Sequence, residues 1–322
     1  MTAILSFAAA ALAWLGRQGT RAVAVSIFLG VALPQLAATF KPFVTEAIFA
    51  LLVLAFLRVE PRQLRGYFTR PALILSATAW IMLAMPLALG TGFVLMGVDQ
   101  AAPGLFLALI LQASAAPIMS APAFAALMGL DAALSLATLM LCMAVTPATA
   151  PLFAHVFAGM SLAISPYALG LKLFFLLGGS ALVAWTLRRL AGEPWFERQR
   201  ERIDGLNVIT LFVFAIAVMD GVAALLWARP FYVLGLILLS FLVALTSMAI
   251  TALVFLRAGQ ARALALGLSA ANRNMGLMLA AMGGVLPELT WLYMGLAQFP
   301  IYLLPQLLLP LARSIGRERE RP

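Results

Sequence analysis

Ten long apolar runs dominate the sequence. They cover Arg21–Ala38, Pro42–Leu57, Pro71–Met96, Pro103–Met128, Asp131–Phe157, Pro166–Leu187, Leu206–Trp227, Phe231–Leu256, Ala261–Met282 and Trp291–Leu311. About 20 apolar residues suffice to cross a bilayer as a helix. Because the hydrocarbon layer offers no hydrogen-bonding partner, the backbone there must pair within a helix or a closed barrel. The runs lack the alternation of barrel strands, so they predict an all-α polytopic membrane protein with ten transmembrane helices.

The composition excludes several other classes of protein. The chain is 64% hydrophobic and 10% charged, whereas a soluble domain carries about 25% charged residues. A single cysteine, Cys142, and a single histidine, His155, leave no disulfide framework and no thiolate or histidine metal cluster within the chain. The net charge of +9 is spread over short loops rather than gathered in a patch. We therefore expect no nucleic-acid partner, no metal and no cofactor.

The basic residues indicate an orientation. Of the 21 Lys and Arg residues, 17 fall in segments on one side of the predicted spans. Only Lys41 and Arg229 fall on the other side, and Lys172 and Arg273 lie inside spans. Cytoplasmic loops carry the excess of basic residues. This pattern predicts a multi-pass protein of a bacterial inner membrane with both termini in the cytoplasm.

The apolar segment Ala3–Leu15 is too short for a span. No basic residue precedes it, so it fits a signal peptide poorly. We expect an uncleaved interfacial helix or an extension of the first span.

A charged segment, RRLAGEPWFERQRERID at Arg188–Asp204, divides the runs five and five. We interpret this segment as a solvated linker. Because five is odd, a second copy of a five-helix unit would insert upside down, as in many secondary transporters. The sequence thus predicts two inverted repeats, residues 1–160 (with the N-terminal interfacial segment) and 161–322.

Two runs contain residues that disfavour a continuous helix. The fourth, LILQASAAPIMSAPAFAALMG, contains Pro117 and Pro122, and the ninth, ALGLSAANRNMGLMLAAMG, contains Asn272–Asn274 and Gly276. Proline removes a helical hydrogen bond, and Asn and Gly favour non-helical backbone. Interrupted helices at corresponding positions of two repeats point to a binding site near the bilayer midplane. Simple kinks that only assist packing are the alternative.

Arg273 is the most informative single residue. A charge near the bilayer centre costs at least about 2.5–3.5 kcal/mol, so it should face protein or a wet cavity and have a partner. Two roles stay open and are compatible. Arg273 could be an anion-binding group or fixed countercharge beside the ends of the broken helices, or it could cap their carbonyl groups.

Asp220 in the seventh run is the second intramembrane charge. It could pair with Arg273, carry a proton, or lie at the wet outer end of its helix.

Uncharged polar side chains complete the predicted substrate or ion site. They lie on the two interrupted runs, where small polar residues also serve helix packing. The candidates are Gln112, Ser114, Ser120, Ser269, Asn272 and Asn274.

Several segments together resemble the bile acid:sodium symporter family. They are FLRVEPRQLRGYFTRP, APIMSAPAFAALMGLDAALS, TPATAPLF and SAANRNMGL, in the family's order and spacing from Arg21 onward. The resemblance implies ten helices in two inverted repeats. It also implies a core domain with crossing broken helices 4 and 9, and a panel domain that moves against it. Members of the family couple sodium entry to the uptake of bile acids or other organic anions.

The chain departs from the family at the sodium ligands. The family's ninth-helix glutamate aligns with Ser269 and its glutamine with Arg273, while Asn274 is kept; the third-helix glutamine aligns with Ile81. The Ser-Asn pair of the fourth helix falls on Ala121-Pro122 or Pro122-Ala123. A hard cation such as sodium needs several oxygen ligands. We therefore hypothesise that Arg273 is a built-in cation in this region.

The leading functional hypothesis is a secondary or facilitative transporter of a small organic anion, in contact with membrane lipid and not coupled to sodium. A link to protons through Asp220 stays open. The alternatives are a non-transporting membrane sensor on the same fold and an arsenite-type permease, although the latter would want a cysteine in the fourth run. No nucleophile–base pair or paired carboxylate indicates an enzyme.

Overall fold

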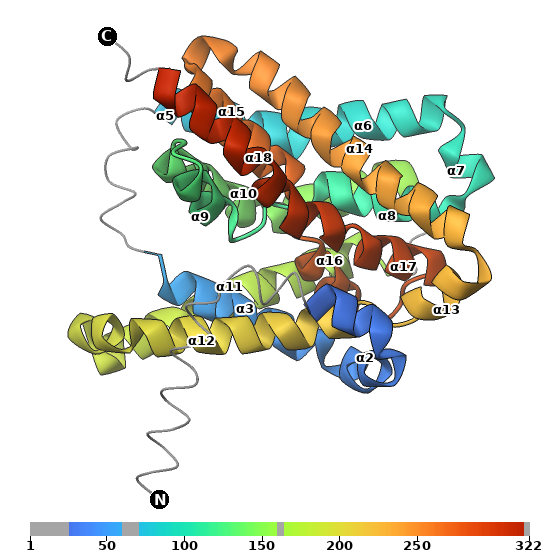
Figure 1. Ribbon diagram of the computed structural model, residues 1–322, viewed down its shortest axis with the longest axis horizontal. Coiled ribbons are helices and arrows are strands. Elements are labelled where there is room, and N and C mark those ends of the chain that lie inside the picture. Colours follow the sequence, from blue (N-terminus) through green and yellow to red (C-terminus); the bar gives the residue numbers. More distant parts are fainter. Residues whose placement is uncertain (1–25, 60–70, 160–163, 319–322) are drawn as a thin grey trace, which may run out of the picture. The chain divides into compact units, whose positions relative to one another are not determined.

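The computed structural model describes residues 26–59, 71–159 and 164–318. Ala3–Leu15, most of the basic segment after Val59 and the extreme C-terminus lie outside the described residues. Residues 26–32 are helical, and Figure 1 shows the elements that follow. In chain order these are α2 Pro34–Phe40, η1 Lys41–Phe43, α3 Val44–Leu57, α5 Pro71–Ala79, η2 Trp80–Ala84, α6 Met85–Leu95, α7 Val98–Ala101, α8 Pro103–Ser114, α9 Ala121–Leu127, α10 Ala132–Phe153, η3 Ala154–Ala158, α11 Pro166–Ala191, α12 Glu193–Ala217, α13 Val222–Ala228, α14 Pro230–Val254, η5 Leu256–Ala258, α15 Gln260–Ala271, α16 Met275–Met282, α17 Glu288–Leu296 and α18 Gln298–Glu318.

The prediction of an all-α membrane protein is confirmed. Among the described residues no strand is present beyond one isolated bridge. Within the described ranges, six helical segments are long and apolar enough to cross a membrane, and the bent pair α12 and α13 makes a possible seventh. The six are Pro34–Leu57, Pro71–Leu95, Ala132–Ala158, Pro166–Ala191, Pro230–Val254 and Glu288–Leu309. The last five begin within three residues of a predicted run, so the chain is a multi-pass membrane protein.

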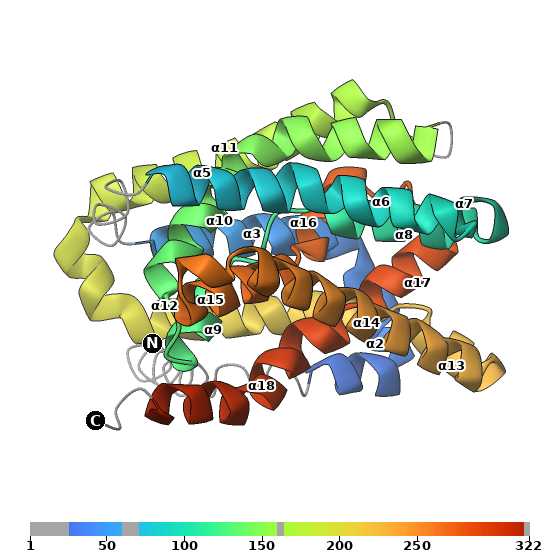
Figure 2. The same ribbon diagram turned by 90° about the horizontal axis from the view of Figure 1, so that it is seen from above.

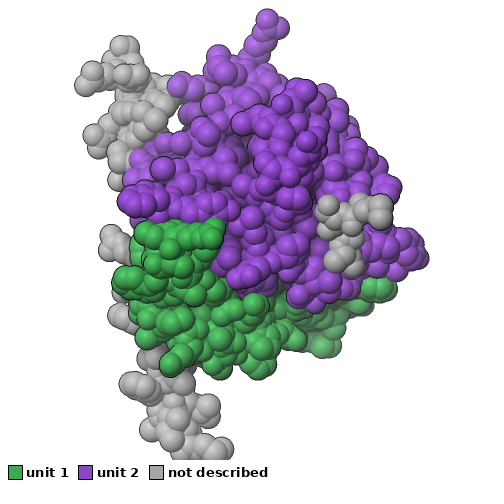
Figure 3. Space-filling model, turned by 90° about the vertical axis from the view of Figure 1, so that its right-hand side faces the viewer, with its two compact units in different colours: residues 1–59, 174–230 green, residues 60–173, 231–322 purple. Residues whose placement is uncertain are grey.

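The chain folds into two compact units, coloured separately in Figure 3. Unit 1 consists of Met1–Val59 and Phe174–Pro230, and unit 2 of Glu60–Leu173 and Phe231–Pro322. Residues 1–160 and residues 161–322 each contribute to both units. The predicted repeats are therefore not the spatial units, and the repeat relationship stays a prediction.

Unit 1 is built on the packing of α3 against α12. Its apolar cluster includes Leu54 and Leu57 of α3, Ala184 of α11 and Phe196 of α12. Between α12 and α13 the helix path bends by 41°, and Gly221 takes up the left-handed conformation there with a φ of 81°.

The prediction of a linker at Arg188–Asp204 is wrong, although the segment is solvated as expected, with Phe196 its one buried residue. Helix α11 continues to Ala191 and α12 begins at Glu193, so that Gly192 alone, with a φ of 78°, forms the corner. The physical reason is burial: Phe196 is 8% exposed, and Ile203 packs against the same cluster. Charged residues between these two positions make the segment polar in composition but amphipathic in three dimensions.

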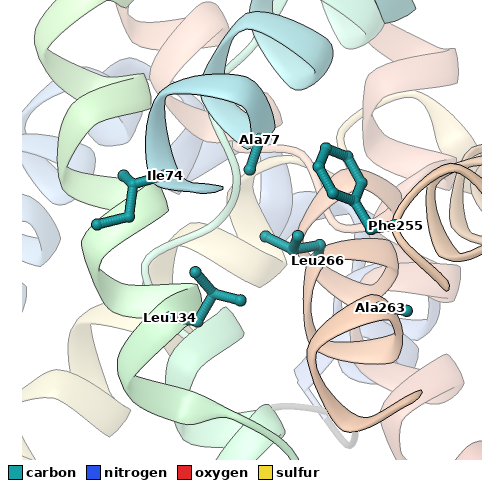
Figure 4. Close-up of a cluster of buried hydrophobic side chains, with 6 residues drawn as sticks. All are labelled: Ile74, Ala77, Leu134, Phe255, Ala263 and Leu266. Atoms are coloured by element: carbon teal, nitrogen blue, oxygen red, sulfur yellow. The ribbon is translucent and has the colours of Figure 1, made fainter. Parts of the chain in front are cut away.

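Unit 2 holds both interrupted runs. At one end of the unit, α5, α10 and α15 pack together through an apolar cluster shown in Figure 4. The cluster consists of Ile74, Ala77, Leu134, Phe255, Ala263 and Leu266. The N-cap of α10 beside it is Asp131, whose carboxylate accepts the backbone N–H of Leu134 at 3.0 Å and a hydrogen bond from Arg262 at 3.4 Å. These contacts hold α15, which leads into the second interrupted segment, against α10.

Candidate functional site

Both predicted helix interruptions are present in unit 2. Helix α8 ends at Ser114 and α9 begins at Ala121, while α15 ends at Ala271 and α16 begins at Met275. The backbone turns extended at Ala115 (ψ 148°) and at Asn272 (ψ 92°). Each interrupted run therefore consists of two short helices joined by non-helical backbone.

The two non-helical segments cross and pair with each other. The N–H of Ile118 donates to the carbonyl of Asn272 at 2.8 Å, and the N–H of Asn274 donates to the carbonyl of Ala116 at 2.8 Å. Pro117 and Arg273 face each other as one antiparallel bridge between these bonds. Because Ile118 and Asn274 donate the two hydrogen bonds, the bridge needs no N–H from Pro117. Proline is therefore compatible with this position.

The side chain of Arg273 lies at this crossing and is 3% exposed. Its Nε donates to the carbonyl of Ala270 at 2.8 Å, and Nη1 donates to the carbonyl of Ala115 at 2.9 Å. Ala270 and Ala115 lie at the C-terminal ends of α15 and α8, where carbonyls lack intrahelical partners and the helix dipole is negative. The guanidinium therefore caps both broken helices at once.

The third acceptor of Arg273 is the carbonyl of Ile81. Nη1 and Nη2 donate to it at 3.2 and 3.3 Å. Ile81 belongs to η2, a π-helical turn in which the N–H of Met85 bonds to Trp80. The next possible donor for Ile81 would be the N–H of residue 86, which is proline and has none. The π-turn and Pro86 together leave this carbonyl available, and the buried cation uses it.

The polar side chains of the ninth run have separate roles. Asn274 caps α16 by accepting the N–H of Leu277 at 3.0 Å. Asn272 donates to the carbonyl of Leu268 at 3.0 Å, whereas its Oδ1 is buried and has no hydrogen-bond partner among the described residues. Ser269 is fully buried, donates to the carbonyl of Ala265 and lies 2.9 Å from the hydroxyl of Ser135.

The polar residues of the fourth run differ in their environments. Ser114 donates to the carbonyl of Ile110 one turn back, which is a role in helix packing. Gln112 accepts a hydrogen bond from the hydroxyl of Tyr293 on α17 at 2.8 Å. Ser120 precedes α9, is partly exposed, and makes no side-chain cap.

Two of the predicted helix-breaking residues do not break a helix. Pro122 lies in the first turn of α9 and Gly276 in the first turn of α16. Proline is favourable in a first turn because its missing N–H needs no partner there. Pro117 and the Asn272–Asn274 segment lie at the actual interruptions.

Asp220 is paired within unit 1 rather than with Arg273. Its carboxylate accepts a hydrogen bond from Lys41 at 2.8 Å, with side chains 23% and 47% exposed. Lys41 lies in η1, and Asp220 lies at the bend between α12 and α13. Of the alternatives that the sequence left open, the pair with Arg273 is therefore wrong.

The sequence analysis did not identify two buried polar residues of α10. Ser135 and Thr138 lie on one face of α10 at a spacing of three residues, which is a signal that the sequence did contain. Both are fully buried, and the hydroxyl of Thr138 has no hydrogen-bond partner among the described residues. Within these residues no group of three His, Cys, Asp or Glu side chains could hold a metal ion.

The Gln112–Tyr293 hydrogen bond gives a first testable prediction. Tyr293 is fully buried and Gln112 is 4% exposed, so Tyr293→Phe leaves the Gln112 oxygen without its donor. We expect a loss of about 1–2 kcal/mol in unfolding free energy. Denaturant titration of Tyr293→Phe, Gln112→Leu and the double variant measures it. The double variant should cost less than the two single losses added together; strict additivity would show that the bond contributes nothing.

Neither the protein-family models nor the curated proteins contain a match to this chain.

Proposed function

We propose that the chain is a secondary or facilitative transporter that moves a small organic anion by alternating access without a requirement for sodium. The observation that carries the proposal is the guanidinium of Arg273. It binds carbonyls of two interrupted helices at the point where their non-helical segments pair. Non-helical backbone at membrane depth is tolerated where it is enclosed by protein or borders an aqueous cavity, as in transporters.

In the proposed topology, α8 with α9 and α15 with α16 are two broken spans. Together with the six long segments, the bent α12–α13 pair and a first span that includes residues 26–32, they make ten. The two five-helix halves are inverted repeats, unit 2 is the core domain, and unit 1 is the panel. We infer a bacterial inner membrane with both termini in the cytoplasm from the distribution of basic residues.

The absence of a sodium requirement follows from charge. A monovalent cation would have to share the crossing carbonyls with a guanidinium that already occupies them. The glutamate expected from the family resemblance is replaced by Ser269, whose hydroxyl is engaged with Ser135 and Ala265. A buried like-charge neighbour and the loss of a carboxylate both weaken cation binding.

The role of Arg273 in this proposal is that of a fixed countercharge. Its Nε and Nη atoms donate to carbonyls and its side chain is 3% exposed, so a direct bond to the anion is not the role that the geometry supports. The substrate anion would instead need a hydrogen-bond donor, for which the partly exposed hydroxyl of Ser120 is the candidate. The unpartnered Oδ1 of Asn272 is an acceptor, so it could serve only an O–H or N–H group of the substrate. An arsenite-type permease ranks lower because Cys142 is fully buried within α10.

The test is counterflow in proteoliposomes. A panel of bile acids, monocarboxylates and dicarboxylates is first screened for thermal stabilisation of the purified chain, and the best ligand is then used radiolabelled. We expect exchange to be equal in sodium chloride and in choline chloride. Arg273→Gln should abolish exchange, and Arg200→Gln, at an exposed position, should keep it.

Each alternative has its own outcome in the same assay. A strict sodium requirement would contradict the proposal. Stabilisation by a ligand without any counterflow would favour the sensor. Accumulation driven by an imposed pH gradient, lost in Asp220→Asn while exchange persists, would assign proton coupling to Asp220.

A further inference from the structure

The corner between α11 and α12 carries an exposed combination of tryptophan and arginine. Figure 2 shows the chain passing from α11 into the start of α12, coloured yellow. On α11, Trp185 is 56% exposed and the guanidinium of Arg189 lies 5.2 Å from the centre of its ring. On α12, Trp195 is 44% exposed. Tryptophan side chains of this kind collect at membrane–water interfaces.

Most charged residues in the first turns of α12 fall on two stripes, with Arg200 beside the acidic one. At 100° per residue, positions spaced by three or four share a face. One stripe is basic, aromatic and apolar: Trp195, Arg198, Arg202, Leu206 and Ile209. The other is acidic: Glu193, Glu197, Glu201 and Asp204. The first set is called the basic stripe below.

At both of its ends, the acidic stripe forms ion pairs with arginine side chains of the same chain. Glu193 lies 3.6 Å from Arg188, and Asp204 lies 3.1 Å from Arg58. The two arginines of the basic stripe instead make hydrogen bonds to neutral oxygens within α12. Arg198 donates to the carbonyl of Pro194 at 3.1 Å, and Arg202 donates to Gln199 at 2.7 Å. Their positive charge therefore remains available at the surface.

The basic stripe runs directly into exposed apolar surface. Leu206 and Ile209, one and two turns beyond Arg202, are 47% and 39% exposed. They belong to the bent pair α12 and α13, which together are apolar enough to cross a membrane. A continuous line from apolar residues to arginine and tryptophan matches the order of hydrocarbon, headgroup phosphate and interface in a bilayer leaflet.

We propose that the basic stripe, with Trp185 and Arg189 at the end of α11, binds the headgroups of anionic phospholipids. Guanidinium groups match phosphate in geometry and charge, and basic residues near a membrane surface are attracted to anionic lipid. The partner is the surrounding bilayer rather than a protein, because the stripe continues the lipid-facing surface. This inference is independent of the transport proposal.

The experiment is native mass spectrometry of the purified full chain titrated with phosphatidylglycerol or phosphatidylcholine. The wild type should bind phosphatidylglycerol more tightly. Arg198→Gln/Arg202→Gln should lower that affinity about 30-fold, which is about 1 kcal/mol for each arginine, and leave phosphatidylcholine binding unchanged. The control is Arg200→Gln/Arg229→Gln, which removes the same charge at exposed positions off the stripe and should keep the wild-type preference.

Circular dichroism of each variant in phosphatidylcholine nanodiscs checks that the fold is intact. Arg198→Lys/Arg202→Lys, which keeps the charge, should retain most of the preference. Equal losses in the two glutamine variants would show that net charge rather than this stripe attracts the lipid. That result, or a wild type without preference for phosphatidylglycerol, would overturn the proposal.

Discussion

Replacing Arg273 with glutamine is expected to be the most damaging single change at the crossing. The variant loses the cation that donates hydrogen bonds to the carbonyls at the C-terminal ends of α8 and α15. It leaves the carbonyls of Ala115 and Ile81 buried without a donor. Hydrogen bonds from charged groups contribute about 1.5–3 kcal/mol, and unpaired buried groups cost a similar amount. We expect a loss of at least about 3 kcal/mol in unfolding free energy. Denaturant titration in detergent measures it.

The same variant tests the idea of a built-in cation. If the guanidinium stands in for an ion, Arg273→Gln should gain thermal stability in sodium chloride relative to choline chloride, and the wild type should not. Arg273→Lys should be intermediate, since an ammonium keeps the charge but cannot serve three carbonyls in the geometry of a guanidinium. Arg200→Gln should change stability by no more than about 0.5 kcal/mol. An Arg273→Gln variant as stable as the wild type would contradict the role of Arg273 as a cap for the two broken helices.

The second large effect is expected at Gly267, where α15 passes close to α14. A Cβ atom placed there would lie 2.8 Å from the carbonyl oxygen of Met248 and 3.3 Å from its Cγ. Because the nearest atom belongs to helical backbone, the helices must separate to accept it. We expect Gly267→Ala to cost about 2–3 kcal/mol, at the upper end of overpacking effects.

Gly235 on α14 provides a control of opposite sign. A Cβ atom at Gly235 would meet nothing within 4 Å, and alanine is favoured over glycine within a helix by about 0.5–1 kcal/mol. Gly235→Ala should therefore stabilise the protein slightly while Gly267→Ala destabilises it. Thermal unfolding of the two variants side by side checks the prediction, and equal shifts of the two in the same direction would contradict it.

The sequence predicted the helices and both interruptions because these depend on composition and on proline and asparagine within a short window. It did not predict which carbonyls Arg273 binds. Ile81 lies 192 residues away from Arg273, and its carbonyl becomes available only because a π-turn precedes Pro86. An alignment compares side chains, and the side chain of Ile81 cannot be a sodium ligand, whereas the structure uses the backbone carbonyl of this residue.

Two other errors have similar physical causes. The segment after Arg188 is charged in composition, yet Phe196 and Ile203 give it a buried side, so it is helical. Pro122 and Gly276 are helix breakers in the interior of a helix, but here they lie in first turns. In both cases the effect of a residue depends on where its helix starts, and a short sequence window does not contain that information. Asp220 forms an ion pair with Lys41, which lies in a distant segment of the same unit. The sequence contains no local signal for this pairing.

The attachment of the cation to the polypeptide has an energetic consequence. A free ion that binds on one side of a membrane and leaves on the other carries the energy of its own gradient into the cycle. The guanidinium of Arg273 is never released, so it can do no such work. If the proposed function holds and no proton is coupled through Asp220, such a protein can bring its cargo only to electrochemical equilibrium. The net direction of movement of an anion is then set by its concentrations on the two sides together with the membrane potential.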